Sequence, residues 1–314
     1  MGAQPRCDLR MDAALTLGID LGGTQLRVAL VNNSGEILKR AALATDTAGG
    51  PNAVIAQMVR LADDVGFREF AHLVEAVGVS APGPLDSDTG TIIDIPTLPG
   101  WAKFPLRSVL AGQFSRPVTL ENDGISAAFG EWKFGAGKGL ANLVYVTVST
   151  GIGGGVVVDG KLMRGYRGMA GHVGHMMIAR EGPQCACGGV GCFEALASGT
   201  AFGQAGRKHG FENGEAIVAA ARRGDATACE LVAREADCLG YGFASLLHLY
   251  SPQRLIVGGG VSHALDLMLP QIQAKTAQMV MSPFRAAEIV PAMLGDSSGI
   301  IGAAQLALIE ASVL

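Results

Sequence analysis

The chain has 314 residues, of which 49% are hydrophobic and 17% charged, and its net charge is −4. We expect two domains, because a single core seldom grows beyond about 250 residues. No block of Lys and Arg is present that could follow a nucleic-acid backbone, and we therefore expect no nucleic-acid partner.

Residues 1–14 mix charged and small residues and lack the apolar segment of a signal peptide, so we interpret them as a flexible leader. Residues 139–158 are uncharged and long enough to cross a membrane, but polar residues and glycines divide them into two predicted strands. We therefore expect no membrane partner, and the cysteine usage described below predicts a cytoplasmic protein.

Residues 15–21 form a short apolar run that ends in Asp20-Leu21-Gly22-Gly23-Thr24. The alternation that follows, and the run over 37–44, predict a hairpin with a third strand behind it. A carboxylate at a strand end, beside two glycines and a hydroxyl, can hold hydrated Mg²⁺ and offer N–H groups to the phosphates of a nucleotide. An ordinary Asp-Gly turn is the alternative.

The next stretch predicts a helix over 51–65, a strand over 74–79 and a helix over 105–114. The strand runs into Ser80-Ala81-Pro82-Gly83-Pro84, at a carboxyl end where ligands of open α/β sheets commonly bind. Trp101 follows Pro99-Gly100 and is expected either to stack on a sugar or to anchor packing.

Residues 118–121 predict a strand whose end delivers Asn122 and Asp123 to a helix over 124–132. A carboxylate at this junction can accept a proton from a bound hydroxyl, while the adjacent amide fixes the substrate. A helix N-cap is the alternative explanation.

The segment 149–155, with the sequence STGIGGG, lies between two β-branched runs. It can place several backbone N–H groups on one side without obstruction by Cβ atoms, as phosphate oxygens require. The alternative is a tight hairpin whose glycines only supply positive φ angles.

One imidazole and three thiols follow within eighteen residues: His175, Cys185, Cys187 and Cys192. Four N and S ligands suit a closed tetrahedral zinc site, and disulfide bonds or a redox thiol pair are the alternatives. The other cysteines, Cys7, Cys229 and Cys238, are isolated, which fits a reducing compartment.

Residues 199–210, 214–224 and 225–250 predict helices rich in Ala and Leu. A strand over 254–257 then enters Gly258-Gly259-Gly260, where an adenine or ribose could lie close to the backbone. A strand over 289–293 and a helix over 299–311 follow.

The strand-to-glycine units DLGGT, STGIGGG and VGGGVS, together with the Asn-Asp pair and the C-x-C-x₄-C cluster, resemble the ROK family of sugar kinases and repressors from about residue 15 onward. The resemblance implies an α/β, actin-like ATPase (ribonuclease H-like) fold of two lobes with a ligand cleft between them, and a homodimer. We expect a small lobe over 15–121 plus 296–314, and a large lobe with the zinc site over 122–295.

The resemblance also implies roles for particular residues. Asp123 would be the catalytic base on the 6-hydroxyl of a sugar. ATP with Mg²⁺ would contact Asp20, Gly22, Gly23, Thr24, Thr150, Gly151, Gly153, Gly154, Gly258, Gly259 and Gly260. The sugar would contact Gly83, Asn122, Asp123, His172, His175 and Glu194, and structural Zn²⁺ would be held by His175, Cys185, Cys187 and Cys192.

Two positions depart from the glucokinase pattern of the family. His172 stands where most kinases have the Glu of a Glu-x-Gly-His motif, and Thr97 stands where glucokinases usually have Asn. The phrases AGHVGH and CACGGVGC resemble bacterial N-acetylmannosamine kinases, which implies phosphorylation of N-acetylmannosamine in sialic acid or amino sugar catabolism. A glucokinase, or another hexose or N-acetylhexosamine kinase, is the alternative.

Two non-enzymatic classes are also considered. A repressor of the family would carry a winged helix-turn-helix of several dozen residues, for which the fourteen residues before the first strand leave no room. A silent sugar-binding regulator is expected to lose the base or a phosphate turn, whereas Asp20, Asp123 and Thr150 are all present. An active kinase is the favoured expectation.

Overall fold

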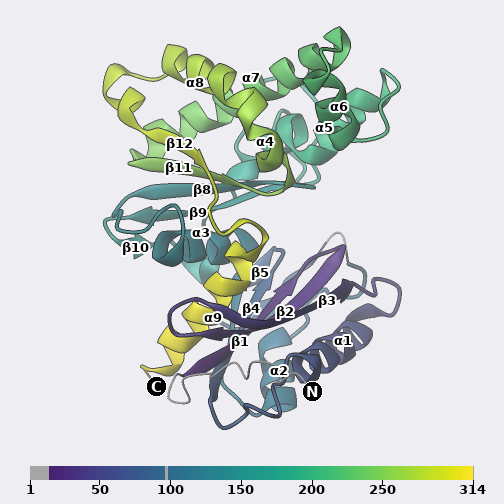
Figure 1. The fold of residues 1–314 in the computed structure, drawn as a ribbon, viewed down its shortest axis with the longest axis vertical. Coiled ribbons are helices and arrows are strands. Elements are labelled where there is room, and N and C mark those ends of the chain that lie inside the picture. The colour runs from purple at the N-terminus through teal and green to yellow at the C-terminus, as the bar shows by residue number, and fades with distance from the viewer. Residues whose placement is uncertain (1–13, 96–97, 314) are drawn as a thin grey trace, which may run out of the picture. The chain divides into compact units, whose positions relative to one another are not determined.

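The computed structural model describes residues 14–95 and 98–313, and Figure 1 shows the fold. Residues 1–13 of the predicted leader, with Cys7, and Thr97 lie outside the described residues. The chain divides into two compact units, here called unit 1 (residues 14–121 and 303–313) and unit 2 (residues 122–302). The second boundary falls inside the last helix, and not at residue 296, because Gly302 packs against Ser126 of unit 2.

Unit 1 is built on a five-stranded sheet with the strand order β3-β2-β1-β4-β7. The first three strands form an antiparallel meander, and β4 runs parallel to β1. The strands are β1 (Leu15–Leu21), β2 (Gln25–Asn32), β3 (Ile37–Ala44), β4 (Val74–Ala81) and β7 (Val118–Asn122), and a separate pair is formed by β5 (Leu85–Asp86) and β6 (Thr91–Ile92).

Alternate residues of these strands face opposite sides of the sheet. The side with Leu17 and Ile19 packs into a core with the buried faces of α1 (Gly50–Asp64) and α2 (Leu106–Phe114). The other side meets the end of α9 (Ser298–Ala311) that belongs to unit 1. The Ala303 carbonyl oxygen lies only 2.0 Å from where a Cβ on Gly78 would be, so glycine is needed at this crossing.

Unit 2 contains a second five-stranded sheet, with the order β10-β9-β8-β11-β12. An antiparallel meander is again followed by strands beside its first member, and β11 and β12 run parallel to β8. The two units therefore repeat one strand order. The strands are β8 (Leu143–Val148), β9 (Ile152–Val158), β10 (Lys161–Leu162), β11 (Arg254–Gly258) and β12 (Glu288–Pro291).

Helices cover both faces of this second sheet, with α3 on one face and α7 and α8 on the other (Figure 1). The alternation of β8 explains this, because Val144 and Val146 join the core with α7 and α8, whereas Leu143 and Tyr145 pack with α3. The helices are α3 (Asp123–Phe134), α4 (Phe193–Ala197), α5 (Gly199–Arg207), α6 (Gly214–Arg222), α7 (Ala226–Tyr250) and α8 (Leu265–Met279). Short 3₁₀ turns are η1 (Tyr166–Gly168), η2 (Val173–His175), η3 (Gly260–Ala264), η4 (Ser282–Ala286) and η5 (Gly295–Ser297).

Helix α8 is absent from the sequence prediction. Pro270 lies inside it, and a proline there removes one helical hydrogen bond, so the segment reads poorly as a helix. Burial of Leu265, Met268 and Ile272 in the core shared with α7 stabilises it.

The start of α9 is tied to α3 by a buried carboxylate. Glu131 is fully buried and accepts hydrogen bonds from the backbone N–H groups of Ala136, Met293 and Leu294 and from the Ser298 hydroxyl. One side chain therefore fixes the connection from β12 into α9.

None of the helices in the described part of the chain combines the length and the apolarity that crossing a bilayer requires.

Candidate functional site

In unit 1, the predicted metal carboxylate Asp20 lies at the centre of a row that crosses three strands. Asp20 on β1 is paired in register with Arg27 on β2 and Ser80 on β4. Its Oδ2 accepts a hydrogen bond from Arg27 Nη1 at 3.0 Å, and its Oδ1 accepts one from the Ser80 hydroxyl at 2.9 Å. Each carboxylate oxygen has a further lone pair, so Asp20 can still accept from the water shell of Mg²⁺.

The turn after Asp20 is fixed by two hydrogen bonds from Thr45, the residue that follows β3. The Thr45 hydroxyl donates to the Gly22 carbonyl at 2.7 Å, and the Thr45 N–H donates to the Thr24 carbonyl at 3.0 Å. Gly22 and Gly23 are half-buried, while Thr24 is exposed. The turn can therefore present Thr24 and backbone groups to a ligand.

Two further positions of unit 1, Gly83 and Trp101, were considered as contacts for a sugar. Gly83 is half-buried in the turn between β4 and β5. Trp101 is only 1% exposed and stacks edge-on against Phe104. It anchors packing, and the expectation that it stacks on a sugar is wrong because its ring is enclosed in the core.

In unit 2, Asn122 and Asp123 lie where β7 meets α3. The Asn122 side chain caps the helix by accepting from the Gly124 N–H at 3.0 Å, so the cap is Asn122 and not Asp123. Asp123 is the first helical residue, is half-buried and also accepts from the Gly124 N–H, at 2.7 Å. Because Asn122 provides the cap, Asp123 is not needed for that purpose.

The glycine-rich segment is the turn between β8 and β9, with Ser149 and Thr150 exposed at its tip. Gly151 and the three glycines 153–155 are not among the residues with positive φ, so the alternative explanation of their presence is wrong. They permit close approach instead. A Cβ on Gly124 of α3 would lie 2.5 Å from the Gly154 nitrogen, and one on Gly153 would lie 3.9 Å from Asp123 Oδ1.

Glu194 joins this turn to the cysteine-rich loop. Its Oε2 accepts a hydrogen bond from the Ile152 N–H at 2.8 Å, and its Oε1 lies 3.9 Å from Cys185 Sγ. A Cβ on Gly151 would lie 2.4 Å from Glu194 Oε2, so the carboxylate occupies space that a side chain would take. Glu194, which is predicted to contact the sugar, therefore also contacts the predicted phosphate turn.

The two histidines of the AGHVGH motif lie face to face, with ring centroids 6.0 Å apart and planes inclined by 23°. Burial, and then the neighbouring His175, lower the pKa of His172, so its imidazole is neutral at pH 7. His175 is exposed. A neutral His172 can donate one hydrogen bond and accept another.

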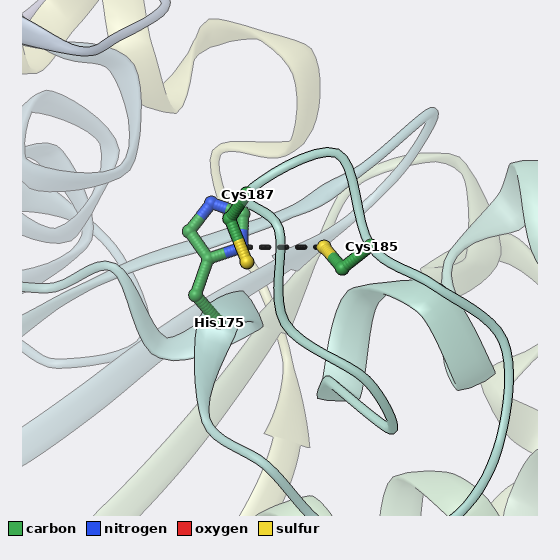
Figure 2. Close-up of side chains that lie close together, drawn as sticks. All are labelled: His175, Cys185 and Cys187. Atoms are coloured by element: carbon green, nitrogen blue, oxygen red, sulfur yellow. Dashed lines mark hydrogen bonds between the residues drawn. The ribbon is translucent and has the colours of Figure 1, made fainter.

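Three of the four predicted metal ligands are brought together into one group (Figure 2). Figure 2 shows His175, Cys185 and Cys187 pointing toward one another, and their ligand atoms lie within 4.8 Å of each other. Cys185 Sγ is 3.6 Å from His175 Nδ1, and Cys192 reaches the group through Cys187, with the two sulfur atoms 3.6 Å apart. All cysteines in the described ranges, 14–95 and 98–313, are free thiols, so the disulfide alternative is not realised.

The protonation of these thiols matters for metal binding. Burial raises the pKa of Cys185 and raises that of Cys192 to about 12, whereas a hydrogen bond from the Gly189 backbone lowers that of Cys187. Thiolates are the form that binds a metal, so metal binding at this cluster would release protons. Three thiols and one imidazole form a donor set that fits Zn²⁺.

The third glycine unit follows β11. Gly258 packs on the Tyr145 ring, and Gly259 has a φ of +81° that a side chain would strain. Gly260 has no atom within 4 Å of its Cβ position. Of the three, only Gly260 borders open space where a ligand could approach the backbone.

Two contacts of the site were not predicted from the sequence. Arg27 could have been found from the hairpin register, since it lies opposite Asp20 when the turn is centred on residues 22–25. The bond between Glu194 and Ile152 has no signal in the sequence, because it depends on how α4 packs beside the turn.

Comparisons with known proteins agree over nearly the whole chain. A model of the ROK family matches residues 16–310. A glucokinase of Thermotoga maritima is 34% identical over 308 residues, covering 92% of this chain and 96% of that protein. An N-acetylmannosamine kinase of Yersinia pestis is 32% identical over 290 residues, covering 92% of this chain and 96% of that protein.

A solved structure is similar as well. The ROK family glucokinase from Streptomyces griseus, in complex with glucose and AMPPNP, has a TM-score of 0.83 and 32% identity, over 94% of this chain and 100% of that one. This likeness confirms the α/β, actin-like ATPase fold class predicted from the sequence.

Proposed function

This chain belongs to the ROK family, and from that membership we propose that it is an ATP-dependent sugar kinase acting on the 6-hydroxyl of a hexose. The observation that carries the proposal is the position of Asp123 in unit 2, half-buried at the first residue of α3 and 3.9 Å from where a Cβ on Gly153 would be. Because Gly153 has no side chain, a sugar hydroxyl could approach the Asp123 carboxylate from this side.

Phosphoryl transfer asks a protein mainly for alignment and charge stabilisation, because charge in the transition state is spread over the equatorial oxygens. Asp123 would accept the proton of the sugar hydroxyl, and Asn122 would orient the sugar. The backbone N–H groups of Gly23 and Thr24 in unit 1, and of Thr150 and Gly151 in unit 2, would face phosphate oxygens. Mg²⁺ held through water by Asp20 would neutralise charge on the phosphates when bound.

The proposed zinc ligands are His175, Cys185, Cys187 and Cys192, and the geometry and chemistry of this donor set support the assignment. Zinc with four protein ligands would serve structure, fixing the loop around the cysteines. The homodimer stays a prediction, which the mass of the protein in solution tests.

For the acceptor sugar we propose N-acetylmannosamine, with glucose as the second candidate. His172 supports the first, because an imidazole can donate to the carbonyl of an acetamido group, whereas a carboxylate can only accept. The glucokinase relatives support the second. The two sugars differ at C2, so the residue at position 172 should discriminate between them.

The Asp123→Asn variant tests the kinase assignment. We expect a loss of turnover of about 10²–10⁴-fold with sugar affinity largely kept, because the change removes a proton acceptor from a preformed site. Turnover and sugar binding are measured on the same preparation, with Asp64→Asn, an exposed carboxylate of α1, as the control. Retention of more than about a tenth of the wild-type rate contradicts the role of general base. Sugar binding without turnover in the wild type would indicate a regulator.

The acceptor is tested by the kcat/KM values of N-acetylmannosamine, glucose, mannose and N-acetylglucosamine. We expect N-acetylmannosamine to rank first and His172→Glu to shift preference toward glucose, because unpaired polar groups in a dry site discriminate strongly. His209→Glu, at an exposed position, is the matched control. Glucose in first place would reverse the choice of sugar and leave the kinase assignment intact.

A further inference from the structure

The cysteine-rich loop and the proposed phosphate turn are connected by one side chain. Glu194 lies two residues after Cys192, in the first turn of α4. One of its oxygens accepts from the Ile152 N–H at 2.8 Å, and the other lies 3.9 Å from Cys185 Sγ. The carboxylate therefore contacts the turn on one side and the cysteine cluster on the other.

The position of Glu194 depends on the cysteine cluster. Cys192 is the N-cap residue of α4, and its sulfur lies 3.6 Å from that of Cys187. Residues 186–188, in contrast, are exposed and lie in a turn. A bound metal ion would join these two parts and so restrict the start of α4, because metal ligation at such a cluster contributes directly to folding.

The conformation of the turn depends in turn on the segment that carries Glu194. Besides the Glu194 bond to Ile152, the Gly199 N–H at the start of α5 donates to the Ser149 carbonyl at 2.7 Å. Within the described residues, the N–H groups of Thr150 and Gly151 have no protein acceptor. Holding Ile152 and Ser149 in place therefore leaves these two donors for an anion.

We propose that the metal cluster and the phosphate turn are energetically coupled through Glu194, so that a metal ion at His175, Cys185, Cys187 and Cys192 strengthens binding of the nucleotide phosphates. Glu194 is then a positioning residue for the turn, in addition to its predicted contact with the sugar. The inference rests on the proposed function, in which residues 149–155 bind ATP. Coupling of this kind is reciprocal, so bound nucleotide must also strengthen retention of the metal.

The test measures nucleotide affinity without sugar. A non-hydrolysable ATP analogue with Mg²⁺ is titrated into the full chain, zinc-loaded and zinc-depleted, by calorimetry. We expect the Kd of the analogue to rise at least about fivefold on zinc removal in the wild type. In Glu194→Ala the two forms should show the same, weakened affinity. Glu181→Ala, which removes an exposed carboxylate of the same loop, should behave as the wild type.

A second measurement covers the case in which the zinc-depleted chain unfolds. Zinc-loaded protein is challenged with a chromogenic chelator in the presence and absence of the analogue. Nucleotide should lower the fraction of zinc extracted from the wild type and from Glu181→Ala, but not from Glu194→Ala. This readout does not depend on catalysis or on a stable metal-free form.

The outcomes separate the two claims. An analogue Kd that is independent of zinc, zinc extraction that is independent of nucleotide, or equal behaviour of the two alanine variants overturns the coupling and leaves the kinase assignment standing. A wild-type protein that binds no nucleotide in either form overturns both.

Discussion

Replacing Glu131 with Gln tests the buried junction between α3 and α9. In the wild type, Oε2 accepts from the N–H groups of Ala136 at 2.8 Å and Met293 at 3.1 Å. Oε1 accepts from the Leu294 N–H at 2.8 Å and the Ser298 hydroxyl at 2.7 Å. Glutamine has the same shape but only one acceptor oxygen, so its NH₂ group must take one of the two places.

In either orientation of the glutamine amide, its NH₂ group faces at least one backbone N–H group, so two hydrogen-bond donors oppose each other. An NH₂ in place of Oε2 faces two backbone N–H groups. An NH₂ in place of Oε1 can donate to the Ser298 hydroxyl, which is able to rotate, but the Leu294 N–H still loses its acceptor. A buried unpaired donor costs about 1–3 kcal/mol, and bonds to a charged acceptor are stronger than bonds to an amide. We therefore expect Glu131→Gln to lower the free energy of unfolding by about 2–4 kcal/mol.

Urea denaturation followed by fluorescence measures this difference, because the two tryptophans lie in different units: Trp132 in unit 2 and Trp101 in unit 1. Glu230→Gln, at an exposed position of α7, is the control and should change stability by less than about 0.5 kcal/mol. A loss below about 1 kcal/mol in Glu131→Gln would refute the reasoning, since it would mean that the four donors find other acceptors.

Two further predictions concern ion pairs and buried charge. Arg27→Met should lower the kinase rate about tenfold or more and raise the Mg²⁺ concentration needed for half-maximal rate, because Asp20 loses a charged hydrogen bond. A Mg²⁺ titration measures both values. The control Lys39→Met, which breaks an exposed ion pair with Glu69, should leave both unchanged. Burial raises the pKa of Glu235 to about 8 from an ordinary value of 4.5, so the stability this group contributes is complete below pH 4.5 and is lost as the pH rises toward 8. Glu235→Gln should therefore gain stability over the wild type between pH 5 and pH 8, by up to about 5 kcal/mol in urea denaturation, and an equal difference at both pH values would contradict the assignment.

The strongly periodic parts of the fold could be predicted from the sequence, whereas the short helix α4 and the longer helix α8 could not. The β1 run and the α7 segment have clear apolar patterns, and the structure has a strand and a helix there. Helix α8 contains Pro270, and its stability comes from side chains that pack on α7. Local sequence carries no information on such a partner, so tertiary packing decides this element.

The candidate site could likewise be predicted from the sequence only in part. Residue types and spacing indicated the Asn-Asp pair and the cysteine cluster, because a carboxylate at a strand end suits proton transfer and four clustered N and S donors suit a metal ion. The sequence did not show why glycines 151 and 153–155 are needed, since they permit the close approach of Gly124 and Glu194 and do not have positive φ. Contacts between distant segments decide such details, and spacing along the chain does not record them.

The division of the chain has a consequence for protein synthesis. Unit 1 needs its last segment, because Gln305 Nε2 donates to the Asn32 carbonyl at 2.6 Å and Thr119 donates to Glu310 at 2.6 Å. The ribosome makes the first 121 residues before any of unit 2 and residues 303–313 after all of it. During translation one face of the sheet of unit 1 therefore stays uncovered until residues 303–313 are made. Unit 2, whose residues are continuous, is the first unit that can complete its fold.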